Sequence, residues 1–61
     1  MTQAEQFAQA HRGDTAALMT ALDAAGIPAD QDWANERTIW TFADGSSVEI
    51  SGPIVRVLQA A

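Results

Sequence analysis

Apolar side chains in the first 25 residues follow the spacing of an amphipathic helix. Phe7, Leu18 and Leu22 can share one face of a continuous helix over residues 3–25. The segment is also rich in alanine, glutamine, leucine and methionine, which are good helix formers. Asp14 would fall on the same face, so the hydrophobic pattern predicts helix but is interrupted near its middle.

The interruption coincides with Gly13, which costs roughly 1 kcal/mol relative to alanine inside a helix. Asp14 or Thr15 would make a good N-cap for a second helix. Two interpretations remain open: one helix that tolerates the glycine, or two segments over 3–12 and 15–25. We favour two helical segments, or one helix with a weak joint.

Both ends of the helical half carry local signals. Thr2 and Glu5 have the spacing of a capping box, in which each side chain satisfies a free backbone N–H, so helix should begin near Gln3. At the other end, Gly26 suits a left-handed C-terminal residue and Pro28 prevents the helix from continuing. Residues 27–36 then read as an acidic connector with one large aromatic residue, Trp33.

Alternating β-branched and aromatic residues predict a β-hairpin over 37–51, with its turn near Asp44 and Gly45. A two-residue turn would pair apolar with polar residues across the strands. A three-residue loop, residues 43–45 with Gly45 left-handed, places Trp40 opposite Val48 and Thr38 opposite Ile50. We therefore expect Trp40, Phe42, Val48 and Ile50 on one face and Ile39, Thr41 and Glu49 on the other.

A further strand is predicted over residues 54–58, which follow the turn at Gly52 and Pro53 and are mostly β-branched. The alternative is a C-terminal helix with Pro53 in its first turn. The expected fold is α+β, a single domain over residues 1–61 with the helical half (3–25) packed on a three-stranded antiparallel β-meander (37–58). The expected core consists of Phe7, Leu18, Met19, Leu22, Ile27, Trp33, Ile39, Trp40, Phe42, Val48, Ile50, Ile54, Val55, Val57 and Leu58.

Charge adds the main functional constraint. The chain has eight carboxylates against three arginines and no lysine, a net charge of −5. Direct nucleic-acid binding is disfavoured, because phosphate contacts are made mainly by lysine and arginine, and the charge suits a basic partner. With no cysteine, no secretory signal and no long apolar run, we expect a soluble protein in the cytoplasm of a bacterial host, without membrane contact.

No catalytic, metal or cofactor signature accompanies the charge. Asp30, Asp32 and Glu36 do not match a calcium-binding loop, whose fifth and sixth positions are occupied here by Ala34 and Asn35. The single histidine, His11, cannot form a two-histidine metal site within one chain. The glycines stand singly rather than in a phosphate loop. We therefore expect a protein that is not an enzyme and that holds no cofactor.

The remaining candidates are the carboxylates and one tryptophan. Trp33 lies outside any hydrophobic period, so it either caps the edge of the core or anchors a partner protein, a role in which tryptophan is over-represented. The carboxylates come from several elements that the fold could bring to one surface, where their field would steer a basic partner. The candidate partner-binding residues are Asp30, Asp32, Trp33, Glu36, Asp44 and Glu49.

In size, acidity, alanine-rich composition and lack of catalytic motifs, the chain resembles the small acidic phage-encoded inhibitors of the anti-CRISPR kind, those of type I systems, over its whole length and without a motif match. The resemblance implies an inhibitor that binds a CRISPR effector subunit, with carboxylates imitating nucleic-acid phosphates in its DNA-binding groove. The alternative is a small self-associating structural or accessory protein, in which the open strand edge at residues 54–58 or the face of Ile39 mediates dimerisation. For the chain as a whole we expect a monomer or weak homodimer.

Overall fold

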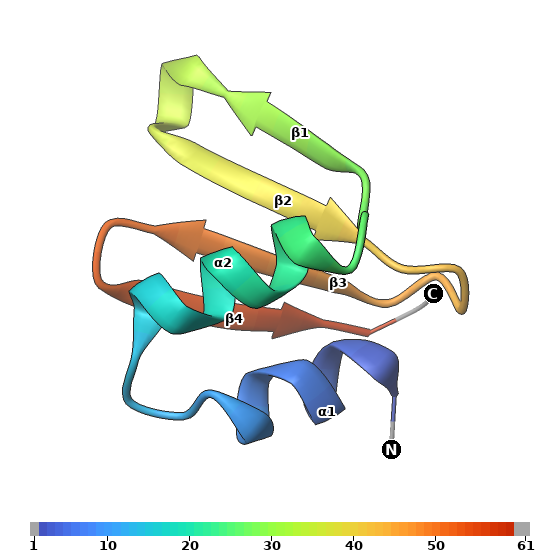
Figure 1. The fold of residues 1–61 in the computed structure, drawn as a ribbon. Coiled ribbons are helices and arrows are strands. Elements are labelled where there is room, and N and C mark those ends of the chain that lie inside the picture. The colour runs from blue at the N-terminus through green and yellow to red at the C-terminus, as the bar shows by residue number, and fades with distance from the viewer. Residues whose placement is uncertain (1, 60–61) are drawn as a thin grey trace.

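Two helices and four strands follow one another along the chain in the computed structural model, which describes residues 2–59. The elements are α1 (Gln3–Ala10), α2 (Thr15–Ala24), β1 (Ala29–Asp32), the 3-10 turn η1 (Trp33–Asn35), β2 (Arg37–Thr41), β3 (Ser47–Ser51) and β4 (Ile54–Leu58) (Figure 1). The strands form one antiparallel sheet in the order β1-β2-β3-β4.

The predicted capping box at the start of α1 is confirmed. The Glu5 backbone N–H donates to Thr2 Oγ1 over 3.2 Å, and the Thr2 backbone N–H donates to Glu5 Oε1 over 3.1 Å. The helical half forms two helices, because Gly13 adopts a φ of +85° that breaks the ladder. Asp14 then caps α2 by accepting the Ala17 N–H over 3.0 Å.

The end of α2 is a Schellman motif, as the glycine and proline predict. Gly26 has a φ of +72°, its N–H donates to the Asp23 carbonyl, and the Ile27 N–H donates to the Leu22 carbonyl over 3.2 Å. This paired hydrogen bonding turns the chain from α2 into the first strand.

The predicted three-stranded sheet is wrong by one strand, because residues 29–32 pair with β2 as β1. Asp30 lies opposite Ile39 and Asp32 opposite Arg37. The sequence of β1, Ala-Asp-Gln-Asp, contains no β-branched or aromatic residue, so it carries no intrinsic strand signal. The strand forms through its tertiary contact with β2. This pairing begins with the hydrogen bond from the Thr41 N–H to the Pro28 carbonyl, over 3.1 Å.

The rest of the sheet confirms the predicted register. Trp40 lies opposite Val48 and Thr38 opposite Ile50. The loop between them has three residues, closed by the Phe42 N–H donating to the Ser46 carbonyl over 2.8 Å, with Gly45 at a φ of +87°. Residues 54–58 form a strand, so the alternative C-terminal helix is wrong.

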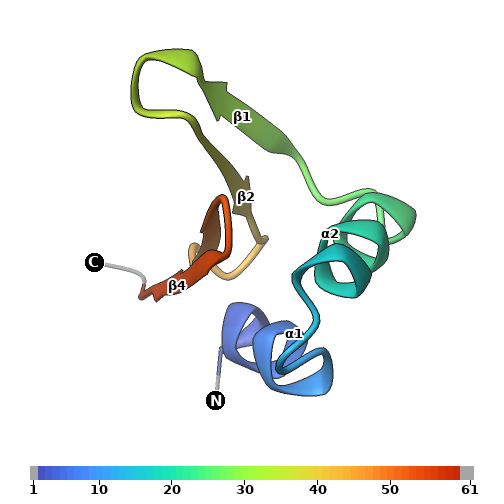
Figure 2. The same cartoon turned by 90° about the vertical axis from the view of Figure 1, so that its left-hand side faces the viewer.

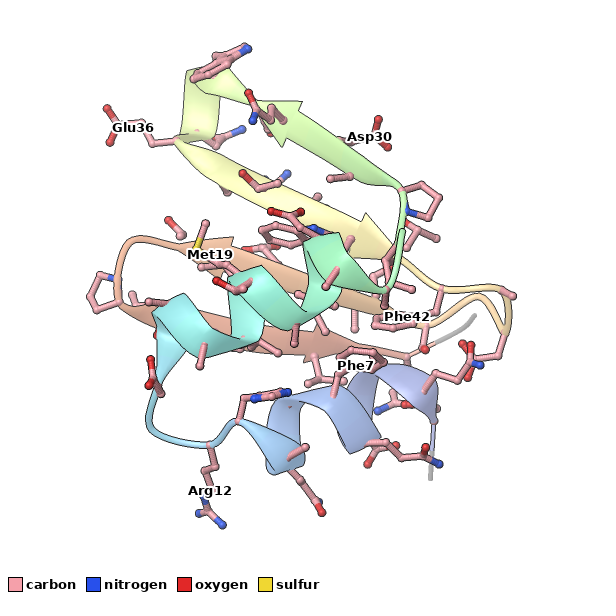
Figure 3. The ribbon with its side chains drawn as sticks, in the orientation of Figure 1. Phe7, Arg12, Met19, Asp30, Glu36 and Phe42 are labelled. Atoms are coloured by element: carbon pink, nitrogen blue, oxygen red, sulfur yellow. The ribbon has the colours of Figure 1, made fainter. Side chains whose placement is uncertain are left out.

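The helices cover one face of the sheet, and the core lies between these two layers (Figure 2). Figure 3 shows Phe7 on α1 beside Phe42, with ring centroids 5.2 Å apart. Three residues expected in the core are exposed instead, because Met19, Trp33 and Ile54 retain 38%, 80% and 59% of their accessible surface. The buried apolar residues are Ala4, Leu18, Leu22, Trp40, Phe42, Val48 and Ile50.

The opposite face of the sheet, called the outer face here, is covered by neither helix, and no other element within residues 2–59 lies over it (Figure 2). Side chains alternate between the faces of a strand, so the register assigns one set to this side. That set includes Asp30, Asp32, Arg37, Ile39, Glu49 and Arg56. Among residues 2–59, no helix is long and apolar enough to cross a membrane.

Candidate protein-binding site

Four of the six predicted partner-binding residues lie together in the segment formed by β1, η1 and β2, called the ribbon (residues 29–41). Asp30 and Asp32 lie on β1, Trp33 begins η1, and Glu36 closes the turn into β2. Figure 2 shows β1 and its turn standing apart from both helices. The fold therefore carries these residues on one ribbon at an edge of the sheet, with Asp32, Trp33 and Glu36 at its turn and Asp30 further back along β1 (Figure 3).

Asp32 organises the turn at the end of the ribbon. Its carboxylate accepts the Asn35 backbone N–H over 3.3 Å and the Asn35 side-chain amide over 2.8 Å, and it pairs with Arg37 Nε over 3.0 Å. These hydrogen bonds, first that of the Asn35 side chain and then that of Arg37, lower the pKa of Asp32 below its ordinary value of 3.8. Glu36 completes the turn in the left-handed conformation, at a φ of 52°.

Trp33 projects from this fixed turn with 80% of its surface exposed, which contradicts the interpretation that it caps the core. It lines a groove of about 380 Å³ together with Asp32, Glu36, Arg37 and Thr38 among others. Tryptophan usually buries a large part of its surface. The exposed ring beside a groove therefore remains available for a contact outside this chain.

Glu49 takes a different role from the one predicted. Its side chain retains only 8% exposure on the outer face, where its carboxylate pairs with Arg37 Nη1 over 3.1 Å. Because Arg37 also pairs with Asp32, one guanidinium links β1 to β3 across β2. Sequence analysis did not assign this role to Arg37, and only the register could have indicated it. The burial and pairing of Glu49 favour a structural function.

Asp44 lies at the opposite end of β2 from Trp33, in the loop before β3. Its carboxylate accepts the Gln3 N–H over 2.9 Å and the Ser46 N–H over 2.9 Å, and it also accepts the Ser46 hydroxyl. Ser46 Oγ in turn accepts the Ala4 N–H over 3.2 Å. These contacts, called the N-terminal clamp here, hold the first turn of α1 against the sheet. Asp44 is therefore structurally engaged and separate from the ribbon.

The carboxylates differ in whether they have a hydrogen-bond or ion-pair partner within the chain. Among residues 2–59, the carboxylates of Asp30 and Glu36 accept no hydrogen bond and form no ion pair, and Figure 3 shows both projecting outward from the ribbon. The remaining carboxylates each have a partner within the chain. These are Glu5 with Thr2, Asp14 with Ala17, Asp23 with Trp40, Asp32 with Asn35 and Arg37, Asp44 with Gln3 and Ser46, and Glu49 with Arg37.

Acid is expected to destabilise the N-terminal clamp. The Gln3 N–H, followed by the hydroxyl and N–H of Ser46, lowers the pKa of Asp44 below its ordinary value of 3.8. A carboxyl with a lowered native pKa stabilises the fold fully above its unfolded-state pKa and loses that effect as pH falls through the native pKa. We expect the thermal unfolding midpoint of the wild type to decrease as the pH is lowered below about 4. In Asp44→Asn this decrease should be smaller.

Circular dichroism melts between about pH 7 and pH 2.5 would measure this dependence. Asp30→Asn is the matched control, because the Asp30 carboxylate has no partner among residues 2–59. The control should retain the wild-type fall at low pH. Identical pH profiles for Asp44→Asn and the wild type would contradict the assignment of the clamp.

A second hollow, of about 400 Å³, lies between the α1–α2 junction and β4. His11, Arg12 and Asp14 line one side of it, and Val55 and Val57 line the other. Within the described part of the chain, no side chain forms a hydrogen bond with the His11 imidazole, so nothing there orients it as a general base. No group of three or more potential ligands that could hold a metal ion occurs among residues 2–59.

Comparisons with known proteins do not add a family to this geometry. No protein-family model, no curated protein and no solved structure matches the chain.

Proposed function

We propose that this protein is a non-enzymatic binding protein that attaches to a basic partner protein through the end of the ribbon. The observation that carries the proposal is the 80% exposure of Trp33. The ring lies at the end of a ribbon that Asp32 and Arg37 fix in place. Tryptophan contributes a large contact area with little loss of side-chain freedom on binding, because it has only two side-chain torsions.

The two unengaged carboxylates support a basic partner. Asp30 and Glu36 flank Trp33 in sequence and form no ion pair with the described residues, so their charge is directed to solvent. Exposed charges of one sign accelerate association with a surface of opposite sign. The exposed ring of Trp33 can also bind an arginine or lysine side chain through cation–π contact.

The more specific form of the proposal is inhibition. A protein that places carboxylates where nucleic-acid phosphates would lie can block the nucleic-acid-binding surface of its partner. A CRISPR effector subunit is the partner class that the resemblance implies. The net charge of −5 supports this form. Because Asp32, Asp44 and Glu49 already have partners within the chain, we restrict the proposed direct contacts to Asp30, Trp33 and Glu36, with Asp32 holding the turn that presents Trp33.

Trp33→Ser is expected to abolish capture of the partner when the purified protein is used as bait in a bacterial lysate. Loss of a central tryptophan contact costs at least about 2 kcal/mol in a typical interface, or roughly 30-fold in affinity. Ile54→Ser is the matched control, because Ile54 is also a large exposed apolar residue but lies on β4. The control should capture the partner, and a high-salt wash should release it by screening exposed charges.

Equal capture by Trp33→Ser and the wild type would contradict the proposed site. Recovery of only further copies of this chain would instead favour the alternative function, self-association through β4 or the face of Ile39. Light scattering of Ile54→Ser would then separate the two functions, since that substitution should weaken self-association through β4 without affecting the ribbon.

A further inference from the structure

We propose that the free edge of β1 is the docking site for an extended, basic segment of the partner, which adds to the sheet as a further strand next to β1. This inference rests on the proposed function and specifies the chemistry of the partner. It also requires that the outward N–H and C=O groups of β1 bind the partner, which the proposed function does not require.

The hydrogen-bond pattern leaves two residues of β1 with their backbone groups directed away from β2. The Thr41 N–H donates to the Pro28 carbonyl, so Pro28 and Thr41 form a hydrogen-bonded pair. Hydrogen-bonded pairs occur at every second residue along an antiparallel ladder. The N–H and C=O groups of Asp30 and Asp32 therefore also point toward β2. The N–H and C=O groups of Ala29 and Gln31 therefore point to the free edge, where a new strand could pair with them.

This edge is open, whereas the other edge of the sheet is partly accompanied by a helix. Ala29, Asp30 and Gln31 are all exposed, and Figure 1 shows β1 as the outermost strand with no helix running along its outer side. At the other edge, α1 packs against β4. An unpaired strand edge is a ready template for an extended chain.

Charge determines which chain fits. Asp30 and Asp32 lie two residues apart on the outer face, so they would stand beside alternate residues of an added strand, with side chains about 5 Å apart. Arginine or lysine beside Asp30 would pair with a carboxylate that has no partner among residues 2–59. A second cation two residues along would join the network in which Asp32 already pairs with Arg37, and Trp33 follows directly at the end of the strand. A second copy of β1 would instead place aspartates next to aspartates, which disfavours self-pairing at this edge.

The experiment uses a short synthetic peptide of alternating arginine and threonine, with a peptide of the same composition but contiguous arginines as comparison. Binding is followed by the fluorescence of Trp33, with Trp40 as the buried second tryptophan. We expect the alternating peptide to bind about tenfold more tightly. We also expect it to protect the Ala29 and Gln31 amides from hydrogen exchange in the full chain.

Gln31→Pro removes one of the outward N–H groups without removing a hydrogen bond to β2, a position where an edge strand accepts proline. Its affinity for the alternating peptide should fall about tenfold below that of Gln31→Ala, which keeps the N–H. Thermal melts show whether both variants are folded. If Gln31→Pro is unfolded, amide protection in the wild type decides the question.

Equal affinity for the two peptides, or binding without protection of Ala29 and Gln31, would overturn the docking of a strand at β1. That result would leave the proposed function standing if Trp33→Ser still abolished partner capture. If Trp33→Ser captured the partner as well as the wild type while the alternating peptide still bound, the proposed function alone would be overturned.

Discussion

Leu22→Ala is expected to lower the free energy of unfolding by about 3 kcal/mol. Leu22 is fully buried between the helices and the sheet, within the cluster that includes Trp40 and Val48. Truncation removes apolar contacts and leaves a cavity that the surrounding side chains fill only in part. A core in a chain of 61 residues rarely supplies more than about 3–5 kcal/mol, so the variant should be substantially unfolded at 25 °C.

Urea denaturation followed by circular dichroism measures this effect, and Met19→Ala provides the matched control. Met19 lies on the same helix less than one turn away but retains 38% exposure. Its truncation should cost less than about 1 kcal/mol, because less apolar surface returns to water. Comparable losses for the two variants would show that α2 is not oriented on the sheet by Leu22.

The elements that the sequence predicts correctly are those whose signals are local. Thr2 with Glu5 and Gly26 with Pro28 mark helix ends within a few residues, and both assignments are confirmed. The three-residue hairpin loop was predictable for a related reason. Only that loop brings Trp40 opposite Val48, and a one-residue slip would have moved the apolar side chains off the core face.

The strand β1 could not be predicted because its pairing energy comes from β2 and its own composition opposes a strand. Ala29, Asp30 and Gln31 bury little surface, so no hydrophobic alternation marks them. The exposure of Trp33 has the same origin. A residue outside any period can point either into the core or into solvent, and here the turn organised by Asp32 directs it outward.

The candidate site was predictable in part. Acidic residues close together in sequence, such as Asp30, Asp32 and Glu36, remain close in space because a single strand and its turn carry them. Asp44 and Glu49 are engaged by partners that are distant in sequence, Gln3 for Asp44 and Arg37 for Glu49. Net charge does not distinguish a carboxylate that holds the fold together from one that is free to bind.

Ser46→Ala is expected to cost about 2 kcal/mol of unfolding free energy, although it removes a single oxygen atom. Ser46 is completely buried, and its hydroxyl accepts the N–H of Ala4, which is also completely buried. The substitution leaves that N–H without a partner and removes the hydroxyl that donates to Asp44. An unsatisfied buried donor costs more than the net gain of the hydrogen bond it replaces.

Ser47→Ala is the matched control, since Ser47 is only half-buried at the start of β3 and its side chain forms no hydrogen bond with residues 2–59. Its cost should stay within about 0.5 kcal/mol in the same urea titration. In the double variant Ser46→Ala with Asp44→Asn, the losses should not add, because both substitutions break one clamp. Additive losses, or equal losses for Ser46→Ala and Ser47→Ala, would show that α1 is held to the sheet by apolar contacts such as that of Phe7 with Phe42 rather than by the clamp.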